Sequence, residues 1–400
     1  MSAAINLRQL FLRHVGQTSD APLALEIVKA KGMELEDAAG KKYLDLIAGI
    51  SVCNVGHCHP KVVKAIRRQA GLYQHVMVYG ELVQSPQVMY AKLLTSRLPA
   101  SLNCVYFTNS GAEATEAAMK LVKRATGRTH IIAFNQSYHG STQGALSLLG
   151  DEYWRNAFRP LLPAVIHADY NDFGMLEQID RHTAAVFVEA VQAERGVVAA
   201  QKKWLTALCK RCKQQGALLV ADEIQTGFGR TGELWGFENY KIVPDIILLG
   251  KALGGGQPLG AVVAGRELLQ LFAGSPVLGH ITTFGGHPVS CAAGLAAFKV
   301  LLKEKYHQKV REKERLFRVL LQHEAIREVR SNGLLLAVAF DDFDTNKKII
   351  DACIERGVFT DWFLFAPHCM RLAPPLIITR NQVRKTVKII LQAIDSVLKK

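Results

Sequence analysis

The sequence predicts an α/β protein, in which a large domain with a mostly parallel sheet between layers of helices is joined by a smaller α+β domain. The chain has 400 residues, of which 49% are hydrophobic and 21% charged, and this length accommodates two such domains. Its middle part alternates short apolar, β-branched runs with helical segments. Buried strands that alternate with helices indicate a parallel sheet covered on both faces.

The elements of the large domain follow in order along the middle of the chain. Apolar runs between turn residues predict strands, and the longer patterns between them predict helices. Strands are expected at 103–110, 129–137, 184–191, 217–224, 245–250 and 260–265, and helices at 113–127 and 204–216. In a sheet of this kind ligands bind outside the carboxyl ends of the strands, so the residues that follow each strand are the candidates for a site.

The two ends of the chain have a different pattern. Residues 34–49 predict a small hairpin with its turn at Ala39 and Gly40, and residues 300–325 read as one long charged helix. A strand at 334–340, a helix near 345–357 and a final amphipathic helix follow. We expect residues 51–290 to form the large, cofactor-binding domain, and residues 1–50 together with 291–400 to form the small one.

Charge and cysteine content narrow the class of protein. The net charge is +14, but the basic residues are interspersed with acidic ones and form no run of five, so a nucleic-acid partner is not expected. The alternative is a solvated surface or a field that attracts anionic ligands. The eight cysteines are expected to be reduced thiols, and neither the pair Cys209 and Cys212 nor the triplet 57–59 is expected to bind a metal.

The sequence shows no pattern of membrane insertion or export. No apolar run reaches the roughly 18 residues that span a bilayer. Residues 1–20 are basic and apolar but contain no long uninterrupted apolar stretch and no clear cleavage site. A cytoplasmic protein without a membrane partner is therefore expected.

Two of the candidate sites are loops that follow strands. Ser110, Gly111 and Ala112 precede the helix at 113–127, where backbone N–H groups and the helix dipole favour an anion such as phosphate. Tyr138 and His139 follow the next strand, and an aromatic ring at that place could stack on a planar heterocycle. Taken alone, a simple helix cap and a partly buried loop tyrosine explain these residues better than a binding site does.

Two further candidates carry charge at the end of apolar strands. Asp222 ends the strand at 217–224, and a carboxylate there requires a cationic partner such as a protonated pyridine nitrogen. Lys251 follows the strand at 245–250 and precedes a glycine run. Desolvation lowers the pKa of a lysine and makes it a nucleophile toward an aldehyde. Together the four loops provide what a pyridoxal-phosphate site requires.

These motifs, in this order, resemble the class III aminotransferases of the ornithine, acetylornithine and 4-aminobutyrate type. The segments 221–232 (ADEIQTGFGRTG) and 250–261 (GKALGGGQPLGA) are the most specific, and the resemblance runs from about Gly56 to about Pro375. It implies fold type I, the fold of many pyridoxal-phosphate-dependent transferases, and pyridoxal 5'-phosphate as the cofactor. It also implies a homodimer with shared active sites.

The resemblance assigns a role to each matching residue. Gly111 and Ala112 would hold the phosphate and Tyr138 would stack on the ring. Asp222 would pair with the pyridine nitrogen, and Lys251 would form the Schiff base and carry the proton. The remaining matches are Gln225 near the ring hydroxyl, Glu189 beneath the ring, and Thr283, which would reach the phosphate of the neighbouring subunit.

Other positions concern the substrates, which are expected to be a small amino donor and an oxo acid. Arg371 matches the arginine that binds the α-carboxylate of glutamate or 2-oxoglutarate, although locally it also reads as a surface arginine before a Pro-Pro turn. Glu194 matches a glutamate that can pair with this arginine when an ω-amino donor leaves it unused. Tyr79 is a further candidate for substrate binding.

The chain departs from the family at three positions. Ser141 stands where members that act on ornithine or acetylornithine usually have arginine, which places donors of the ornithine type in doubt. Arg195 replaces a glycine and His287 an asparagine, and Arg195 is a hypothetical replacement for the missing charge. We expect transfer from an ω-amino acid or diamine-like donor to 2-oxoglutarate. The alternatives are an aminomutase or a decarboxylating relative on the same fold, a basic nucleic-acid-binding protein and an inactive scaffold.

Overall fold

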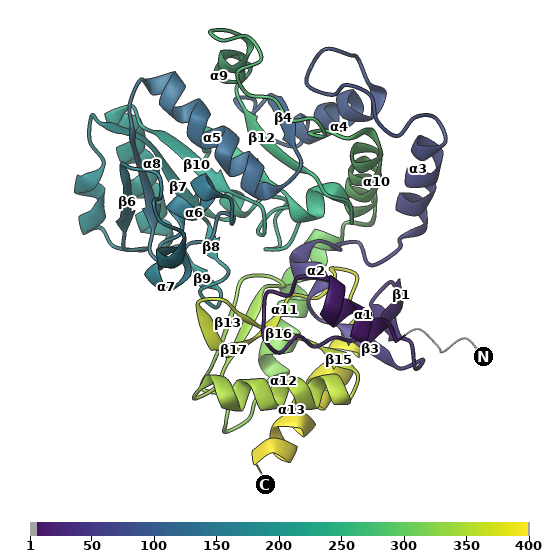
Figure 1. Cartoon of the computed structure of the whole chain (residues 1–400). Helices are drawn as coiled ribbons and strands as arrows, with labels where there is room; N and C mark the ends of the chain where they lie inside the picture. The colour runs from purple at the N-terminus through teal and green to yellow at the C-terminus, as the bar shows by residue number, and fades with distance from the viewer. Residues whose placement is uncertain (1–5, 399–400) are drawn as a thin grey trace.

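The computed structural model describes residues 6–398 and divides into two lobes (Figure 1). A seven-stranded sheet lies in the upper lobe, and two four-stranded sheets lie in the lower one. The seven-stranded sheet has the order β4-β12-β11-β10-β7-β5-β6. Its strands are β4 (Cys104–Thr108), β5 (His130–Phe134), β6 (Val165–Ala168), β7 (Thr183–Glu189), β10 (Leu218–Asp222), β11 (Ile246–Leu249) and β12 (Gly260–Ala264).

This sheet confirms the predicted α/β fold class. Strands β6, β5, β7, β10 and β11 pair in parallel, and β12 runs antiparallel between β11 and β4. Alternate residues of β7 pack into different cores: Val186 faces the side covered by α8 (Lys202–Gln215), and Phe187 faces α5 (Gly111–Thr126). Both faces are thus buried, which explains the continuous apolar runs in the sequence.

The lower lobe brings the beginning of the chain next to its end. One sheet has the order β1-β2-β3-β15, and the other, fully antiparallel, has the order β13-β14-β17-β16. The predicted hairpin is formed by β2 and β3, and β3 then pairs in parallel with β15. The strands are β1 (Ile27–Lys31), β2 (Glu34–Asp37), β3 (Lys42–Asp45), β13 (Glu328–Ser331), β14 (Leu336–Ala339), β15 (Val358–Phe359), β16 (Asp361–Phe363) and β17 (Ala366–Leu372). The exact domain boundaries remain a prediction.

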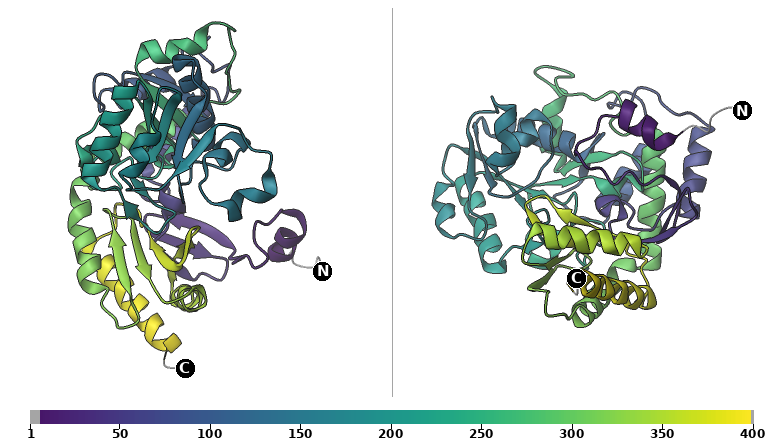
Figure 2. Two further views of the ribbon diagram at one scale, coloured as in Figure 1. Left: turned by 90° about the vertical axis from the view of Figure 1, so that its left-hand side faces the viewer. Right: turned by 60° about the horizontal axis from the view of Figure 1, so that its bottom comes forward.

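The remaining helices surround these sheets (Figure 2). Their bounds are α1 (Leu7–His14), α2 (Ala48–Ser51), α3 (Pro60–Ala70), α4 (Ser85–Thr95), α6 (Gln143–Leu148), α7 (Glu152–Arg155), α9 (Arg266–Leu269), α10 (Pro288–Glu304), α11 (Val310–Leu320), α12 (Phe343–Glu355) and α13 (Arg380–Leu398). The small hairpin β8 (Val191–Gln192) and β9 (Val198–Ala199) lies near the junction of the lobes.

The prediction of one long charged helix over residues 300–325 is wrong. Helix α10 ends at Glu304 because Lys305 adopts a left-handed conformation with φ 52°. A single 3₁₀ turn, Tyr306–Lys309, leads into α11. Two patterns of helical spacing therefore follow each other with a change of direction that the apolar periodicity alone does not reveal.

A buried arginine joins the two lobes. Arg230 is inaccessible to solvent, and its Nη1 donates to the carbonyl oxygens of Leu334 (3.1 Å) and Pro374 (2.5 Å) while Nη2 donates to the side chain of Asn54. Burial lowers the pKa of Arg230 to about 9. The guanidinium thus connects the turn after β10 with both ends of the chain.

Residues 6–398 contain neither a membrane span nor a metal cluster. None of the helices in this range combines the length and apolar character needed to cross a membrane. Within the same range, no group of three or more His, Cys, Asp or Glu side chains is arranged to hold a metal ion. Residues 1–5, which belong to the N-terminal segment considered above, lie outside the described part.

Candidate active site

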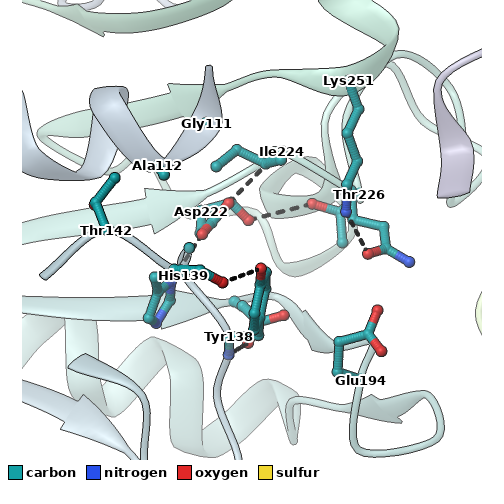
Figure 3. Close-up of a pocket in the computed structure, with 14 residues that line it drawn as sticks. Gly111, Ala112, Tyr138, His139, Thr142, Glu194, Asp222, Ile224, Thr226 and Lys251 are labelled. Atoms are coloured by element: carbon teal, nitrogen blue, oxygen red, sulfur yellow. Dashed lines mark hydrogen bonds and ion pairs between the residues drawn. The ribbon is translucent and has the colours of Figure 1, made fainter. Parts of the chain in front are cut away.

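A pocket of about 470 Å³ opens where strands β5, β7, β10 and β11 end (Figure 3). This is the edge at which ligands bind in sheets of this type. The residues that line it are Gly111, Ala112, Tyr138, His139, Gly140, Ser141, Thr142, Glu189, Glu194, Asp222, Ile224, Gln225, Thr226 and Lys251. Loops far apart in the sequence meet here because their strands are neighbours in the sheet.

Lys251 enters the pocket directly after β11. Its backbone has the unusual φ of 46°, at the start of a short 3₁₀ turn (Lys251–Gly254). The Nζ atom donates to Oε1 of Gln225 at 2.7 Å. Burial lowers the pKa of this lysine and outweighs the nearby carboxylates of Glu194 and Asp222, which raise it. A larger fraction of the amine is therefore neutral than in a solvated lysine.

Asp222 ends β10 with its carboxylate in a buried network. Oδ2 lies 2.7 Å from Nδ1 of His139, and Oδ1 accepts the backbone N–H of Ile224 at 3.0 Å. Burial lowers the pKa of His139, but the hydrogen bond and the charge of Asp222 outweigh this effect and raise the pKa. His139 lines the pocket, and its ring contacts Asp222.

Tyr138, Glu189 and Ile224 form other walls of the pocket. The backbone N–H of Tyr138 donates to Oε1 of Glu189 at 3.1 Å. Burial raises the pKa of Glu189 to about 7. Tyr138 and Ile224 are drawn on different sides of Asp222 in Figure 3. Ile224 was not predicted as a site residue. Its position between Asp222 and Gln225, two predicted site residues, could have indicated that it lines the pocket.

The N-terminus of α5 lies at one end of the pocket. Ser110 caps the helix and accepts the N–H of Glu113 at 3.1 Å, whereas Gly111 and Ala112 line the pocket. Gly140 closes over this end with φ 131°, and a Cβ there would lie 2.6 Å from Cβ of Ala112. A glycine is thus required for the loop to approach the helix this closely.

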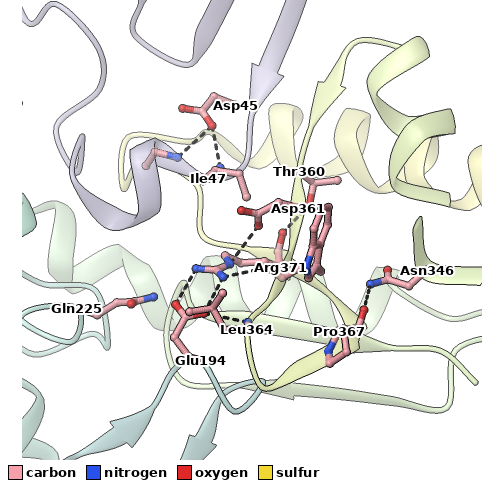
Figure 4. A network of polar contacts seen from close by, with 12 residues as sticks. Asp45, Ile47, Glu194, Gln225, Asn346, Thr360, Asp361, Leu364, Pro367 and Arg371 are labelled. Atoms are coloured by element: carbon pink, nitrogen blue, oxygen red, sulfur yellow. Dashed lines mark hydrogen bonds and ion pairs between the residues drawn. The ribbon is translucent and has the colours of Figure 1, made fainter. Parts of the chain in front are cut away.

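A buried ion pair connects the pocket to the lower lobe (Figure 4). Arg371 on β17 donates from Nη1 and Nη2 to the two carboxylate oxygens of Glu194, at 2.9 and 2.8 Å. Arg371 is only 3% exposed, and its guanidinium lies 4.6 Å from the ring centre of Phe363. The alternative that Arg371 is a surface arginine before the Pro-Pro turn is therefore wrong.

Comparison with known protein families identifies the chain. The family model for aminotransferase class-III matches residues 15–394. The chain belongs to the class-III aminotransferases. This confirms the resemblance drawn from the motifs at 221–232 and 250–261.

Curated relatives of this aminotransferase cover nearly its whole length. The acetylornithine aminotransferase of Methanosarcina mazei is 40% identical over 93% of this chain and 92% of its own length. That of Methanopyrus kandleri is 38% identical over 94% of this chain and 95% of the relative. These relatives do not favour the alternative of an aminomutase.

Solved structures agree with this assignment. The ornithine aminotransferase of Toxoplasma gondii, whose active site holds pyridoxal phosphate at partial occupancy, superposes with a TM-score of 0.90 at 30% identity over 98% of this chain and 94% of that one. An (S)-enantioselective ω-transaminase from Thermomicrobium roseum gives a TM-score of 0.91 at 29% identity, with both chains fully covered.

This class-III aminotransferase uses pyridoxal 5'-phosphate, and the residues of the pocket fit that cofactor. One pocket contains a helix N-terminus for an anion, a carboxylate at Asp222 for a ring cation and an amine at Lys251 for an aldehyde. Nε2 of Gln225 is buried and has no hydrogen-bond partner among the described residues. Because buried amides are normally hydrogen-bonded, this atom fits a polar group of the cofactor.

Some residues predicted for the site do not line the pocket. Ser110 only caps α5. Arg371 does not line the pocket itself but contacts Glu194, which does. Tyr79 and Thr283 are likewise not among the lining residues of this single chain. Arg195 donates to Oε1 of Gln192 at 3.2 Å and does not line the pocket either, so its geometry gives no support to a role in replacing the missing family arginine.

Proposed function

We propose that this aminotransferase moves the amino group of an ω-amino acid or diamine-like donor, of the acetylornithine, ornithine or 4-aminobutyrate type, to 2-oxoglutarate. The observation that carries the proposal is the bidentate pair of Glu194 and Arg371 next to Lys251. A guanidinium fork matches a carboxylate, so the oxo acid would bind Arg371 in place of Glu194. While Glu194 holds Arg371, this guanidinium is not free to bind a carboxylate. The site then suits a donor whose end at this point is uncharged or an amino group.

The cofactor would be held by residues of the large domain. Gly111 and Ala112 would bind its phosphate at the helix N-terminus, and Tyr138 and Ile224 would flank its ring. Asp222 would hold the ring nitrogen protonated, and Gln225 would meet the ring hydroxyl. When bound, pyridoxal phosphate supplies an aldehyde for the amino group and a ring that accepts electrons.

Lys251 would act as the proton carrier of the reaction. Its Nζ is buried, its pKa is lowered, and the amide oxygen of Gln225 orients it. A neutral amine in this position can take a proton from the carbon that carries the amino group of the donor, and it can then deliver this proton to the cofactor. Glu189 would lie beneath the ring, where its Oε1 accepts the backbone N–H of Tyr138 and so fixes the stacking residue.

A homodimer is part of the proposal. Thr283 lies on an exposed segment that also presents Val277 (73% exposed), Ile281 (45%) and Phe284 (53%). An apolar surface of this kind favours contact with a second copy. In such a dimer Thr283 of each chain would reach the phosphate site of the other chain. Light scattering measures the mass of the assembly. Thr283→Ala should weaken cofactor binding without loss of the dimer.

The relatives point to acetylornithine, whereas one residue of the pocket favours other donors. Ser141 lines the pocket at the place where the family arginine would bind a donor α-carboxylate, and its Oγ lies 3.0 Å from the hydroxyl of Tyr138. We therefore propose that donors which do not depend on this arginine are used best.

A donor screen with 2-oxoglutarate tests the proposal. Glutamate formation is measured across acetylornithine, ornithine, 4-aminobutyrate, diamines and α-amino acids. We expect ω-amino or diamine-like donors to give the highest kcat/KM. Arg371→Lys should raise the KM for the oxo acid by roughly 30-fold, because a bidentate contact becomes a single one. Failure of 2-oxoglutarate to accept the amino group from any donor would overturn the proposal.

A further inference from the structure

Arg371 has a second acidic neighbour that the family resemblance does not account for. Asp361 on β16 lies directly opposite Arg371 on β17, and its Oδ1 is 3.0 Å from Nε of Arg371 (Figure 4). Thr360, the preceding residue, donates through Oγ1 to the backbone oxygen of Arg371 at 2.6 Å. The hairpin thus fixes the carboxylate beside the guanidinium.

The two acids contact different edges of one guanidinium. Glu194 occupies the fork of Nη1 and Nη2, and the backbone oxygen of Trp362 accepts a further hydrogen bond from Nη2 at 2.9 Å. Asp361 faces the remaining Nε edge. One buried positive charge is therefore opposed by two carboxylates, and only one of them stands where a substrate carboxylate would bind.

The contact with Asp361 is electrostatic rather than a formed hydrogen bond. Nε of Arg371 and Oδ1 of Asp361 are both buried and both lack a hydrogen-bond partner among the described residues, although they are 3.0 Å apart. Opposite charges on facing residues of a strand pair attract each other even without an aligned hydrogen bond. Here the carboxylate contributes its charge to the site without a directed bond.

The environment of Asp361 sets the pH range in which its carboxylate is charged. Burial raises its pKa to about 6, against the opposing effect of Arg371. Glu194 and Asp45 raise the pKa further, as like charges do. The carboxylate is therefore ionised at pH 8, and it partly cancels the charge of Arg371 that an incoming carboxylate experiences.

We propose that Asp361 is a specificity-determining residue that weakens the binding of substrate carboxylates at Arg371. It thereby favours donors that present no carboxylate at this point. The inference rests on the proposed function, in which Arg371 binds the α-carboxylate of the oxo acid. It goes further by assigning the strength of that interaction to a residue outside the cofactor site.

Binding of glutarate to the holoenzyme tests the inference without turnover. Glutarate is a dicarboxylate of the length of 2-oxoglutarate that has no group to exchange, and its Kd follows from the rise in Tm with concentration at pH 8. We expect Asp361→Asn to lower the Kd of glutarate by roughly fivefold, as removal of a charge from a partly buried cluster should. The KM for the diamine 1,4-diaminobutane, which has no carboxylate, should not fall.

Matched variants separate the effect of the charge at position 361 from the effect of removing a charge elsewhere in the same lobe. Asp341→Asn removes the same charge from an exposed pair with Arg327 in the same lobe and should leave the Kd unchanged. Asp361→Glu keeps the charge and should stay close to the wild type. If Asp361→Asn does not fold, Asp361→Ser is subject to the same expectation.

The outcomes distinguish this inference from the proposed function. An unchanged or higher Kd in the neutral variants, or no binding of glutarate to any of the proteins, overturns the role of Asp361. If 2-oxoglutarate fails as an acceptor but glutarate still binds more tightly to Asp361→Asn, the proposed acceptor is wrong and the role of Asp361 stands.

Discussion

Nδ1 of His139 lies 2.7 Å from Oδ2 of Asp222, and both side chains are almost completely buried. They come from the loop after β5 and from the end of β10, two strands that flank β7 in the sheet. The imidazole also meets the edge of Phe187 at a ring distance of 6.2 Å, so its orientation is fixed from two directions. The carboxylate of Asp222 accepts only one other hydrogen bond from the described residues, that of the backbone N–H of Ile224. His139 therefore positions the carboxylate that would meet the ring nitrogen.

Removal of this imidazole should slow the reaction more than it weakens substrate binding. We expect His139→Ala to lower kcat by roughly tenfold, comparable to the loss of a group that orients a charged ligand, while KM stays within twofold. His139→Asn, whose amide can still donate to Asp222, should recover most of the rate. Equal losses in both variants would show that the cavity, and not the hydrogen bond, causes the effect.

Replacement of Lys251 should remove the central amine of the site. We expect Lys251→Ala to lower kcat by at least about 10³-fold, because proton transfer loses its carrier. Borohydride should attach the cofactor covalently to the wild-type chain and should not attach it to the variant. Steady-state kinetics and mass spectrometry measure the two effects.

Lys313 offers a matched control for this experiment. It is also a buried lysine with a pKa lowered, to about 8, by burial, but it donates to the backbone oxygen of Leu376 and does not line the pocket. Lys313→Ala should reduce stability and leave kcat and the absorption spectrum unchanged. Full activity of Lys251→Ala would refute the assignment of the amine.

Introduction of the family arginine at position 141 should change the choice of donor. Ser141 lines the pocket, and a guanidinium there could bind a donor α-carboxylate. We expect Ser141→Arg to raise kcat/KM for acetylornithine roughly tenfold relative to 1,4-diaminobutane, measured as glutamate formation. Ser141→Ala, the control, should leave this ratio unchanged; the same ratio in all three proteins would contradict the prediction.

His57 should make the stability of the protein depend on pH. Its Nε2 is 2.6 Å from Oδ2 of Asp45. Burial lowers the pKa of His57, but the contacts with Asp45 and Cys53 outweigh burial and raise the pKa from 6.5 to about 10. The folded state thus holds a proton that the unfolded state releases between these values. The associated stabilisation is complete below pH 6.5 and is lost as pH rises through 10.

Unfolding by urea at pH 6, 8 and 10 measures this contribution. Between pH 6 and 10 the wild type should lose on the order of 2 kcal/mol more free energy of unfolding than His57→Gln. His14→Gln, a change at an exposed histidine, should follow the wild type. Parallel pH dependence of His57→Gln and the wild type would rule out this ion pair as the cause.

The sequence predicted the sheet and the residues that follow its strands because both depend on local patterns. Asp222 and Lys251 could be recognised as the charged ends of apolar runs, and neighbouring strands then brought them together. The turn at Lys305 could not be predicted, because the apolar spacing continues past it and only the left-handed backbone interrupts the helix.

The contacts between side chains were harder to predict. The pair of His139 and Asp222 depends on the rotamers of residues that lie 83 positions apart, and no local pattern indicates it. The approach of Asp361 to Arg371 follows from the register of β16 and β17, which became visible only in the structure. The partner of Arg371, Glu194, was known only through the family resemblance.

The parallel pairing of β3 with β15 has a consequence for the synthesis of the chain. Leu44 and Val358 are neighbours in the sheet but are separated by most of the sequence, so the ribosome releases the N-terminal hairpin long before its partner strand exists. Until then the hairpin presents an unprotected strand edge to other nascent chains. The lower lobe can therefore be completed only after residue 358 has been synthesised, and chaperones that shield strand edges should improve the yield of folded protein.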